Sequence, residues 1–284
     1  MKITINGVYA DIQIENEKTV GEILAALETW LADAGHRPSG LSIDGEVINA
    51  ASIDSCFERE IAGVENLDIR TSSLSELTAE SLLRLIHDID TWENSGFDEK
   101  KIFSENWKES PEAGLLAEQA PDLYDWTVKT FSGEGAGAAN LRSLSEERIR
   151  EFKDPADELG KTKQAVAEVC SRLEQLPLDL QTGKDAEAAR TVSVFSGIAE
   201  KVFRIYNVLK MEGFSVEEIT VADMPIKIYM NEFGDALGEM LTAYKQRDTV
   251  LVGDLAEYEM APRLRGLYAA IYNAAAICGA AEGE

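Results

Sequence analysis

The sequence has few of the residues from which catalytic and metal sites are most often built. Of its 284 residues only two are histidine, His36 and His87, and only three are cysteine, Cys56, Cys170 and Cys278. The cysteines are widely spaced and odd in number, which argues against a disulfide framework and is typical of a reducing compartment. Two imidazoles cannot complete a multi-histidine metal shell, and no serine lies in a Gly-x-Ser-x-Gly motif. We therefore expect a protein that is not an enzyme and that uses no cofactor and no metal.

Basic residues and long apolar runs are also scarce. Lys and Arg total 27 against 52 Asp and Glu, a formal charge of −25 at pH 7. Such a charge repels phosphate backbones and anionic lipid surfaces. No apolar run approaches the roughly 18 residues that a membrane span needs, and the first strand pattern starts too early for a signal peptide. We expect a cytoplasmic protein with neither nucleic acid nor a membrane as its partner.

What is present begins with a compact pattern at the N-terminus. Two runs of alternating apolar residues flank Asn6-Gly7, a dipeptide that favours a tight turn because both positions accept positive φ. The pattern predicts a β-hairpin over residues 2–15, with Ile14 on its apolar face. Thr19 and Glu22 form a capping box that starts a helix, and Gly35 ends that helix. Pro38 is expected to prevent its continuation, and His36 is expected in the loop.

Further short strands are predicted at residues 41–43, at Val47 after an Asp44-Gly45 turn, and at residues 67–69. Together, the segments MKITINGVYADIQIE, TVGEILAALETWLADAG, LSIDGEVI and ENLDIRT resemble the ubiquitin-like β-grasp family over residues 1–71. The resemblance implies one helix packed on one face of a small sheet, serving as a structural or docking module.

Two departures from that family limit what the resemblance implies. The last strand continues as Arg70-Thr71-Ser72-Ser73 where conjugated members end in Gly-Gly, so conjugation is not expected. Family members bind partners through an apolar patch on the sheet, and the matching positions here are Val8, Ser42 and Arg70. Only one of these is apolar, so we do not carry that binding surface over.

The remainder of the chain is predicted to be helical. From residue 73 to residue 153 the pattern is irregular, with short helices packed by aromatic residues and a glycine-rich connector. After residue 156, apolar residues recur at alternating steps of three and four, which is typical of an antiparallel helix bundle and allows a homodimer. Chain reversals are expected at residues 177–183, at 213–225 and at Asp248. Pro262 is expected to kink or break the last helix.

The predicted fold class is therefore α+β. An N-terminal ubiquitin-like β-grasp domain is followed by a mainly α-helical part with a long antiparallel bundle. The domains are expected at residues 1–72 for the β-grasp domain, 73–153 for an irregular helical connector region and 154–284 for the bundle.

The most distinctive segment of the bundle is RDTVLVGDLAEYEMAPRLRGL, because it combines an apolar run, several carboxylates and a proline within one helical pattern. One interpretation is a partner-binding surface at the end of the bundle. The other is an ordinary helix start, with Asp248 or Thr249 as N-cap and acidic residues near the positive end of the helix dipole. The candidate partner-binding residues are Asp254, Glu257, Tyr258, Met260 and Arg263.

The function expected from these observations is protein–protein interaction. An adaptor or scaffold of this kind would bind amphipathic helices or basic segments of a partner protein. One alternative is an export or assembly chaperone that keeps aggregation-prone helices soluble. Another is a metal-dependent enzyme that uses the carboxylates of Asp254 and Glu257.

Overall fold

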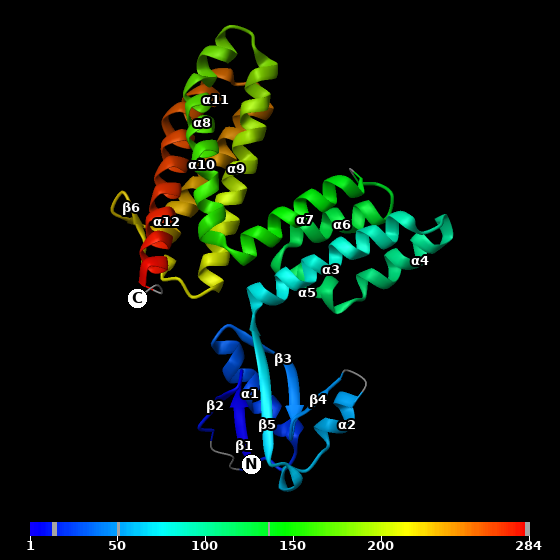
Figure 1. Ribbon diagram of the computed structural model, residues 1–284. Helices are drawn as coiled ribbons and strands as arrows, with labels where there is room; N and C mark the ends of the chain where they lie inside the picture. The colour runs from blue at the N-terminus through cyan, green and yellow to red at the C-terminus, as the bar shows by residue number, and fades with distance from the viewer. Residues whose placement is uncertain (13–15, 50–51, 136, 282–284) are drawn as a thin grey trace. The chain divides into compact units, whose positions relative to one another are not determined.

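The chain divides into two compact units, residues 1–142 and 143–284, and the boundary falls within helix α7 (Ala138–Lys153) (Figure 1). The computed structural model describes residues 1–12, 16–49, 52–135 and 137–281. The fold class is α+β, as predicted, with a small sheet at the N-terminus and helices in the remainder.

The first unit begins with a five-stranded mixed sheet. Its strands are β1 (Lys2–Ile5), β2 (Val8–Tyr9), β3 (His36–Ile43), β4 (Glu46–Ile48) and β5 (Asn66–Ser73). The order across the sheet is β2-β1-β5-β3-β4; β1 and β5 are parallel, and the other neighbours are antiparallel. Helix α1 (Val20–Asp33) lays its apolar stripe on one face, where Val20, Leu67 and Ile69 are fully buried. One helix on one sheet face makes a single two-layer core.

Local signals in the sequence predict the turns and caps of this sheet correctly. Asn6 and Gly7 both have positive φ, 50° and 79°, and the second predicted turn, Asp44-Gly45, does as well. Thr19 and Glu22 form the predicted capping box at the start of α1. Each of these features depends only on residues within one turn of the chain, which is why the sequence alone is sufficient to identify them.

Two predictions for this region need correction. The hairpin is shorter than residues 2–15, since β2 ends at Tyr9; Ile14 lies outside the described residues. His36, predicted for a loop, belongs to strand β3 and pairs with Ser73 of β5; Pro38, which follows the end of α1 as expected, lies in the same strand and pairs with Thr71. The ladder tolerates the proline because its register shifts between Pro38 and Gly40, and such irregularities are where strands accept proline.

Helices complete the first unit. They are α2 (Ile53–Phe57), a 3₁₀ turn at Ile61–Gly63, α3 (Leu74–Asn94), α4 (Phe97–Lys108), α5 (Pro111–Gln119), α6 (Pro121–Phe131) and α7 (Ala138–Lys153), of which α7 continues into the second unit. Aromatic packing joins them as predicted: the ring centroids of Trp92, Phe103 and Trp107 each lie 5.5 Å from that of Phe131. Phe97 was expected, with Phe103 and Trp107, among the aromatic residues that pack these helices, but it is 91 % exposed at the start of α4.

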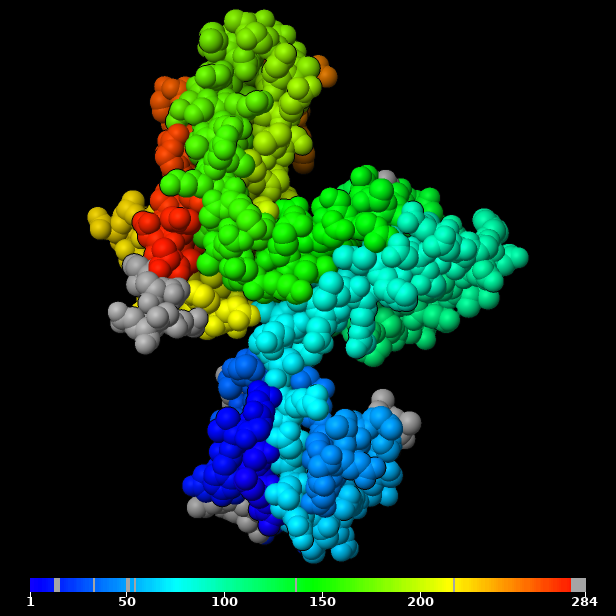
Figure 2. All heavy atoms as spheres, in the orientation of Figure 1, coloured from blue at the N-terminus to red at the C-terminus, as the bar shows by residue number. Residues whose placement is uncertain are grey.

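The second unit is built mainly on long helices. They are α8 (Pro155–Gln181), α9 (Asp185–Met211), α10 (Ile226–Gln246), α11 (Thr249–Leu255) and α12 (Ala261–Ala281), with a 3₁₀ turn at Val216–Glu218, a small hairpin of β6 (Thr220–Val221) and β7 (Met224–Pro225), and a π-helical segment at Ala256–Met260. They share one apolar core that contains Phe195 of α9, Phe233 of α10 and Leu264 of α12. Helix α8 contacts both α9 and α12, and the space-filling view shows α12, in red, lying against α8 (Figure 2).

Of the two prolines expected to interrupt this unit's helices, Pro177 acts differently from the prediction. Pro177, expected at a chain reversal, lies inside α8, and the helix ends only after Gln181, where Gly183 takes a φ of 73°. Pro177 packs against Gly253, where an added Cβ would approach it to 3.1 Å, so a glycine on the neighbouring helix makes room for it. Pro262, expected to kink or break its helix, is the second residue of α12 and directly follows the π-helical segment. Such segments commonly accompany a break in the regular helical hydrogen bonding.

Candidate partner-binding surface

The predicted partner-binding residues occupy the π-helical segment and the turns on either side of it. The Asp248 side chain caps α11 by accepting a hydrogen bond from the backbone N–H of Leu251 at 3.0 Å. This confirms one of the two expected N-caps. The interpretation of this segment as an ordinary helix start is therefore correct for Asp248. It does not decide where the five candidate partner-binding residues lie.

Asp254, Glu257 and Tyr258 face away from the core. Asp254 is exposed, Glu257 is half-buried and the Tyr258 ring is 66 % exposed. Hydrogen bonding to Glu257 raises the pKa of the Tyr258 hydroxyl, and the charges of Glu257 and Asp254 act in the same direction. These three residues form one acidic surface with an aromatic ring at its centre.

Met260 and Arg263 lie elsewhere. Met260, predicted for the same surface, is fully buried in the core of the bundle, so it cannot reach a partner. Arg263 is directed toward α10: its Nε donates to Glu259 at 2.8 Å, and one of its terminal nitrogens donates to Glu232 at 3.3 Å. The guanidinium also lies over the Tyr229 ring at 5.7 Å from the centroid. The five predicted residues therefore separate into an outer surface, a core position and a bridge to α10.

That bridge marks one wall of a groove between α10 and the π-helical segment, which we call the acidic groove. It has a volume of about 350 Å³ and is lined by Glu232, Asp235, Ala236, Glu239, Leu255, Glu259 and Arg263. The four α10 residues follow an i, i+3, i+4, i+7 spacing, which places them on one face of the helix. The groove thus has four carboxylates and one guanidinium around an apolar floor of Ala236 and Leu255.

The charges in the acidic groove are not balanced. Arg263 pairs with Glu259 and Glu232, whereas no cation among the residues that the structure describes pairs with Asp235 or Glu239. Both of these carboxylates are exposed. Ile228, one turn before Glu232 on the same face of α10, is also 50 % exposed. Glu232, Asp235 and Glu239 were not among the residues predicted from the sequence, although their helical spacing is visible in it.

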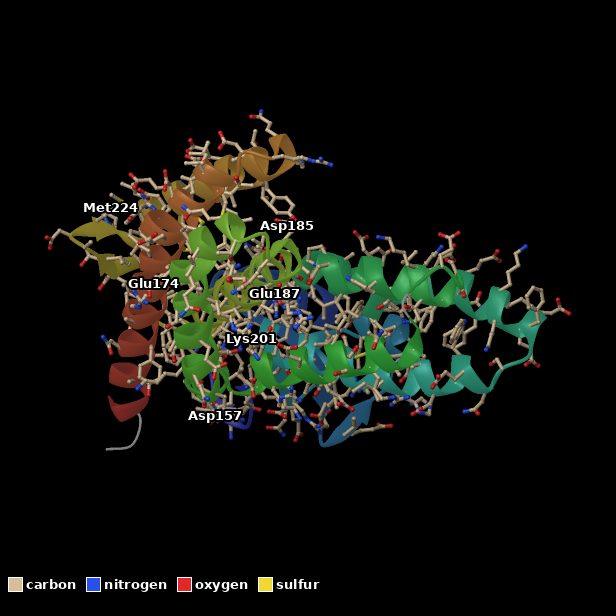
Figure 3. All side chains as sticks on the ribbon, turned by 90° about the horizontal axis from the view of Figure 1, so that it is seen from above. Asp157, Glu174, Asp185, Glu187, Lys201 and Met224 are labelled. Atoms are coloured by element: carbon tan, nitrogen blue, oxygen red, sulfur yellow. The ribbon has the colours of Figure 1, made fainter. Side chains whose placement is uncertain are left out.

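Other acidic residues lie on the outside of the bundle. Figure 3 marks Glu174 on α8 and Asp185 and Glu187 on α9, all three of which are exposed. Glu174 pairs with Arg265 at 2.8 Å, but this pair is solvent-exposed and contributes little to stability. The negative charge of this unit is therefore spread over several helices, and the acidic groove is the place where it surrounds a concave surface.

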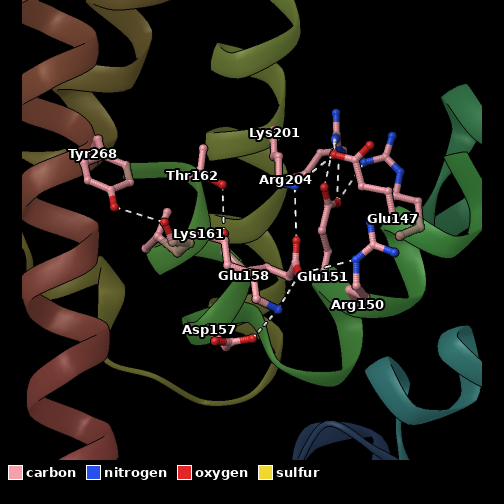
Figure 4. Close-up of polar contacts among 12 residues, drawn as sticks. Glu147, Arg150, Glu151, Asp157, Glu158, Lys161, Thr162, Lys201, Arg204 and Tyr268 are labelled. Atoms are coloured by element: carbon pink, nitrogen blue, oxygen red, sulfur yellow. Dashed lines mark hydrogen bonds and ion pairs between the residues drawn. The ribbon is translucent and has the colours of Figure 1, made fainter. Parts of the chain in front are cut away.

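Acidic and basic side chains are paired in a separate cluster of this unit, which has the buried carboxyl groups of Glu151 and Glu158 at its centre (Figure 4). The cluster joins the end of α7, the start of α8 and the middle of α9 through Glu147, Arg148, Arg150, Glu151, Asp157, Glu158, Lys161, Lys201 and Arg204. Glu151 is 1 % exposed and receives two hydrogen bonds from Arg204, at 2.9 and 3.1 Å, and one from Arg148 at 3.1 Å. Glu158 accepts from Lys161 and Lys201, each at 3.2 Å. The cluster fixes the corner between α7 and α8 onto α9.

Burial affects the two buried carboxyl groups of this cluster differently. Burial raises the pKa of Glu151 to about 8, and the charges of Arg148 and Lys201 oppose this only in part. Burial also disfavours the ionised form of Glu158, but hydrogen bonds from Lys161 and Lys201 outweigh it and hold that pKa below its usual range. Since Glu151 is enclosed by protein, we assign the cluster to stability and not to binding.

The Glu151 carboxyl group should make stability depend on pH. Its pKa is higher in the folded protein than in the unfolded chain, so between about pH 4.5 and pH 8 the folded state holds more protons. The free energy of unfolding should therefore fall as pH rises through this window, by at most about 1.4 kcal/mol per pH unit from this group. In Glu151→Gln this contribution disappears. Urea denaturation of both proteins at several pH values measures the difference, and parallel pH profiles would contradict the assignment.

The described residues also bear on the alternative functions. Among them, no three His, Cys, Asp or Glu side chains gather as they would around a metal ion. Cys56 and Cys170 are buried free thiols, and the side chain of Cys278 lies outside those described. No helix in the described part of the chain has both the length and the apolarity to cross a membrane.

Comparisons with known proteins show similarity in both units. Residues 1–73 match a family model described as the TP0873 N-terminal domain, and residues 157–270 match a domain of unknown function, DUF8042. An uncharacterized protein of Treponema pallidum (strain Nichols) is 22 % identical over 267 residues, which cover 94 % of each chain. No solved structure matches. The similarity to the Treponema protein therefore extends across both units.

Proposed function

We propose that this chain is a non-enzymatic protein that binds a basic segment of a partner protein in the acidic groove. The observation that carries the proposal is the unpaired charge of Asp235 and Glu239 beside an apolar floor. A basic amphipathic helix could place its apolar face on Ala236 and its cations against these carboxylates. The outer surface of Asp254, Glu257 and Tyr258 lies on the same segment and would extend the contact.

We infer that the N-terminal sheet is a β-grasp fold, used to dock or position the protein. Support comes from the parallel pairing of β1 with β5 at the centre of the sheet and from the single helix on one face. The apolar patch of the resembled family is not reproduced here, since of Val8, Ser42 and Arg70 only Val8 is apolar. We place the protein in the cytoplasm, where the free buried thiols of Cys56 and Cys170 would remain reduced.

The proposal predicts that cationic helical peptides bind the acidic groove. A peptide of about 18 residues, with Lys on one face and Leu and Ala on the other, spans about five helical turns. Isothermal titration calorimetry should give saturable binding that weakens when NaCl is raised from about 50 to about 300 mM, because screening shortens the reach of exposed charges. In Asp235→Asn/Glu239→Gln the affinity should fall about two- to thirtyfold.

A matched variant separates the groove from the general acidity of the protein. Asp125→Asn/Glu200→Gln removes the same charge from exposed positions on α6 and α9, outside the groove. Its affinity for the peptide should stay within twofold of wild type or so, by the weakness of isolated surface charges. If both double variants lose the same affinity for the peptide, the peptide responds only to the net charge of the protein, and the acidic groove has no special role in binding it.

A further inference from the structure

A second concave site lies in the first unit, apart from the acidic groove. Helices α3, α4 and α5 surround a cavity of about 610 Å³. It is lined by Leu83, Arg84, His87, Asp88, Phe103, Asn106, Trp107, Ser110 and Glu112. The cavity thus contains apolar walls, one of the two histidines of the chain and two carboxylates.

Asp88 is the distinctive group of this cavity. Its carboxyl group is half-buried, and burial raises its pKa above the usual range. Among the described residues, no Lys, Arg or His nitrogen lies within ion-pair distance of it. The nearest arginine, Arg84, forms its ion pair with Glu112 at the rim. The charges of His87 and Arg84 favour the ionised form of Asp88 but do not outweigh burial, so this carboxylate is neither fully solvated nor fully paired.

Trp107 lies in the wall of the cavity beside this carboxyl group. The residue is 5 % exposed, and its Nε1 is buried without a hydrogen-bond partner among the described residues, although it lies toward Asp88. The indole packs among other rings: the Tyr124 ring stacks at 5.8 Å, and the Phe131 ring is perpendicular to it at 5.5 Å. The cavity therefore has a buried donor beside its carboxyl group.

The walls beside Asp88 are apolar. Leu83 and Phe103 both line the cavity; Leu83 is 46 % exposed and Phe103 is half-buried. Methylene groups pack well on such surfaces, and long cationic side chains commonly bury their stems in this way while the charged head reaches a polar group. The cavity therefore offers one anionic point with an apolar approach to it.

We propose that this cavity binds an alkylammonium group, that is, a primary amine carried on an aliphatic chain. The ammonium pairs with Asp88, and the methylene groups lie against Leu83 and Phe103. The group can belong to a lysine side chain of a partner protein or to a free diamine, and both present the same chemistry. The proposal does not depend on the acidic groove, which belongs to the other unit.

The test follows the indole N–H signals of the full-length protein by two-dimensional NMR. The chain has four tryptophans, and Trp107→Phe identifies the signal of Trp107. Two probes are titrated, 1,5-diaminopentane and Nα-acetyl-lysine methylamide. Each should shift the Trp107 signal in a saturable way and leave those of Trp30 and Trp126 in place. The tighter of the two probes indicates the source of the natural ligand.

Variants and a neutral probe make the test decisive. Asp88→Asn should weaken amine binding about ten- to hundredfold, because a charge-assisted hydrogen bond is lost. Asp98→Asn, an exposed position on α4 outside the cavity, should not. Leu83→Ser, also at an exposed position, should weaken binding through the apolar wall and serves if Asp88→Asn does not fold. The proposal fails if 1-pentanol binds as well as the amines, or if wild type shows no saturable shift.

Discussion

Phe233→Ala should lower the free energy of unfolding by about 3–5 kcal/mol, the usual cost of removing a phenyl ring from a packed core. Phe233 is completely buried on α10, with its ring centroid 6.2 Å from that of Phe195 and 5.5 Å from that of Phe203. Both partners belong to α9, so the aromatic contact is a principal link between these two helices. Because α10 also carries one wall of the acidic groove, peptide binding should weaken in this variant.

Two further variants test whether the loss of stability in Phe233→Ala comes from the space that the missing phenyl ring leaves in the core. Phe233→Leu keeps most of the volume and should cost less than about 1.5 kcal/mol. Leu241→Ala removes an apolar side chain that is 41 % exposed on the same helix, and it should change stability by about 0.5 kcal/mol or less. Urea denaturation gives all three values. A loss below about 1 kcal/mol in Phe233→Ala would mean that α10 does not pack on α9 as described.

Features that depend on neighbouring residues could be predicted from the sequence. The Thr19–Glu22 capping box, the Asn6-Gly7 turn and the Asp248 cap each need only three or four residues, and all three are present. The apolar spacing of the long helices is equally local, since residues three and four apart share a helix face. These signals fix which segments are helical and where several of them end.

Features that depend on distant residues could not be predicted. Pro177 stays inside α8 because Gly253, 76 residues later, leaves space beside it. His36 joins a strand because Ser73 provides its partner. Met260, in contrast, could have been placed in the core from the sequence, because it lies four residues before Leu264 and seven before Leu267, which share its helix face and are also fully buried.

The candidate sites follow the same division. The spacing of Glu232, Asp235 and Glu239 places them on one face, but only the packing of the π-helical segment beside α10 turns that face into a groove. The cluster around Glu151 combines residues from three helices, and nothing in the order of the residues pairs Glu151 with Arg204. Sequence periodicity therefore indicates which faces are available, whereas tertiary packing decides which of them become sites.

Arg204→Leu should be the most damaging change outside the apolar core, and its effect should depend on pH. At about pH 9, above the pKa of about 8 for Glu151, the carboxyl group is charged in the folded protein. Removal of its two-point partner then leaves a buried charge without its main hydrogen bonds, at a cost of about 3–5 kcal/mol. At about pH 5.5 the carboxyl group is largely protonated in the folded state, so the same substitution should cost clearly less.

The double variant Arg204→Leu/Glu151→Gln tests whether the loss arises from the stranded carboxylate. The neutral amide carries no charge and its oxygen can still accept from Arg148, so the double variant should recover most of the stability that Arg204→Leu loses at about pH 9. Glu147 and Lys201 form their own ion pair at 3.0 Å and remain in place. The lost guanidinium affects only the charged form of Glu151. Urea denaturation should therefore show a difference in the free energy of unfolding between the single and double variants, and this difference should become smaller at low pH. If this difference in free energy stays constant from about pH 5.5 to about pH 9, Arg204 stabilises the corner between α7 and α8 through packing alone, and Glu151 carries no charge in the folded protein over this pH range.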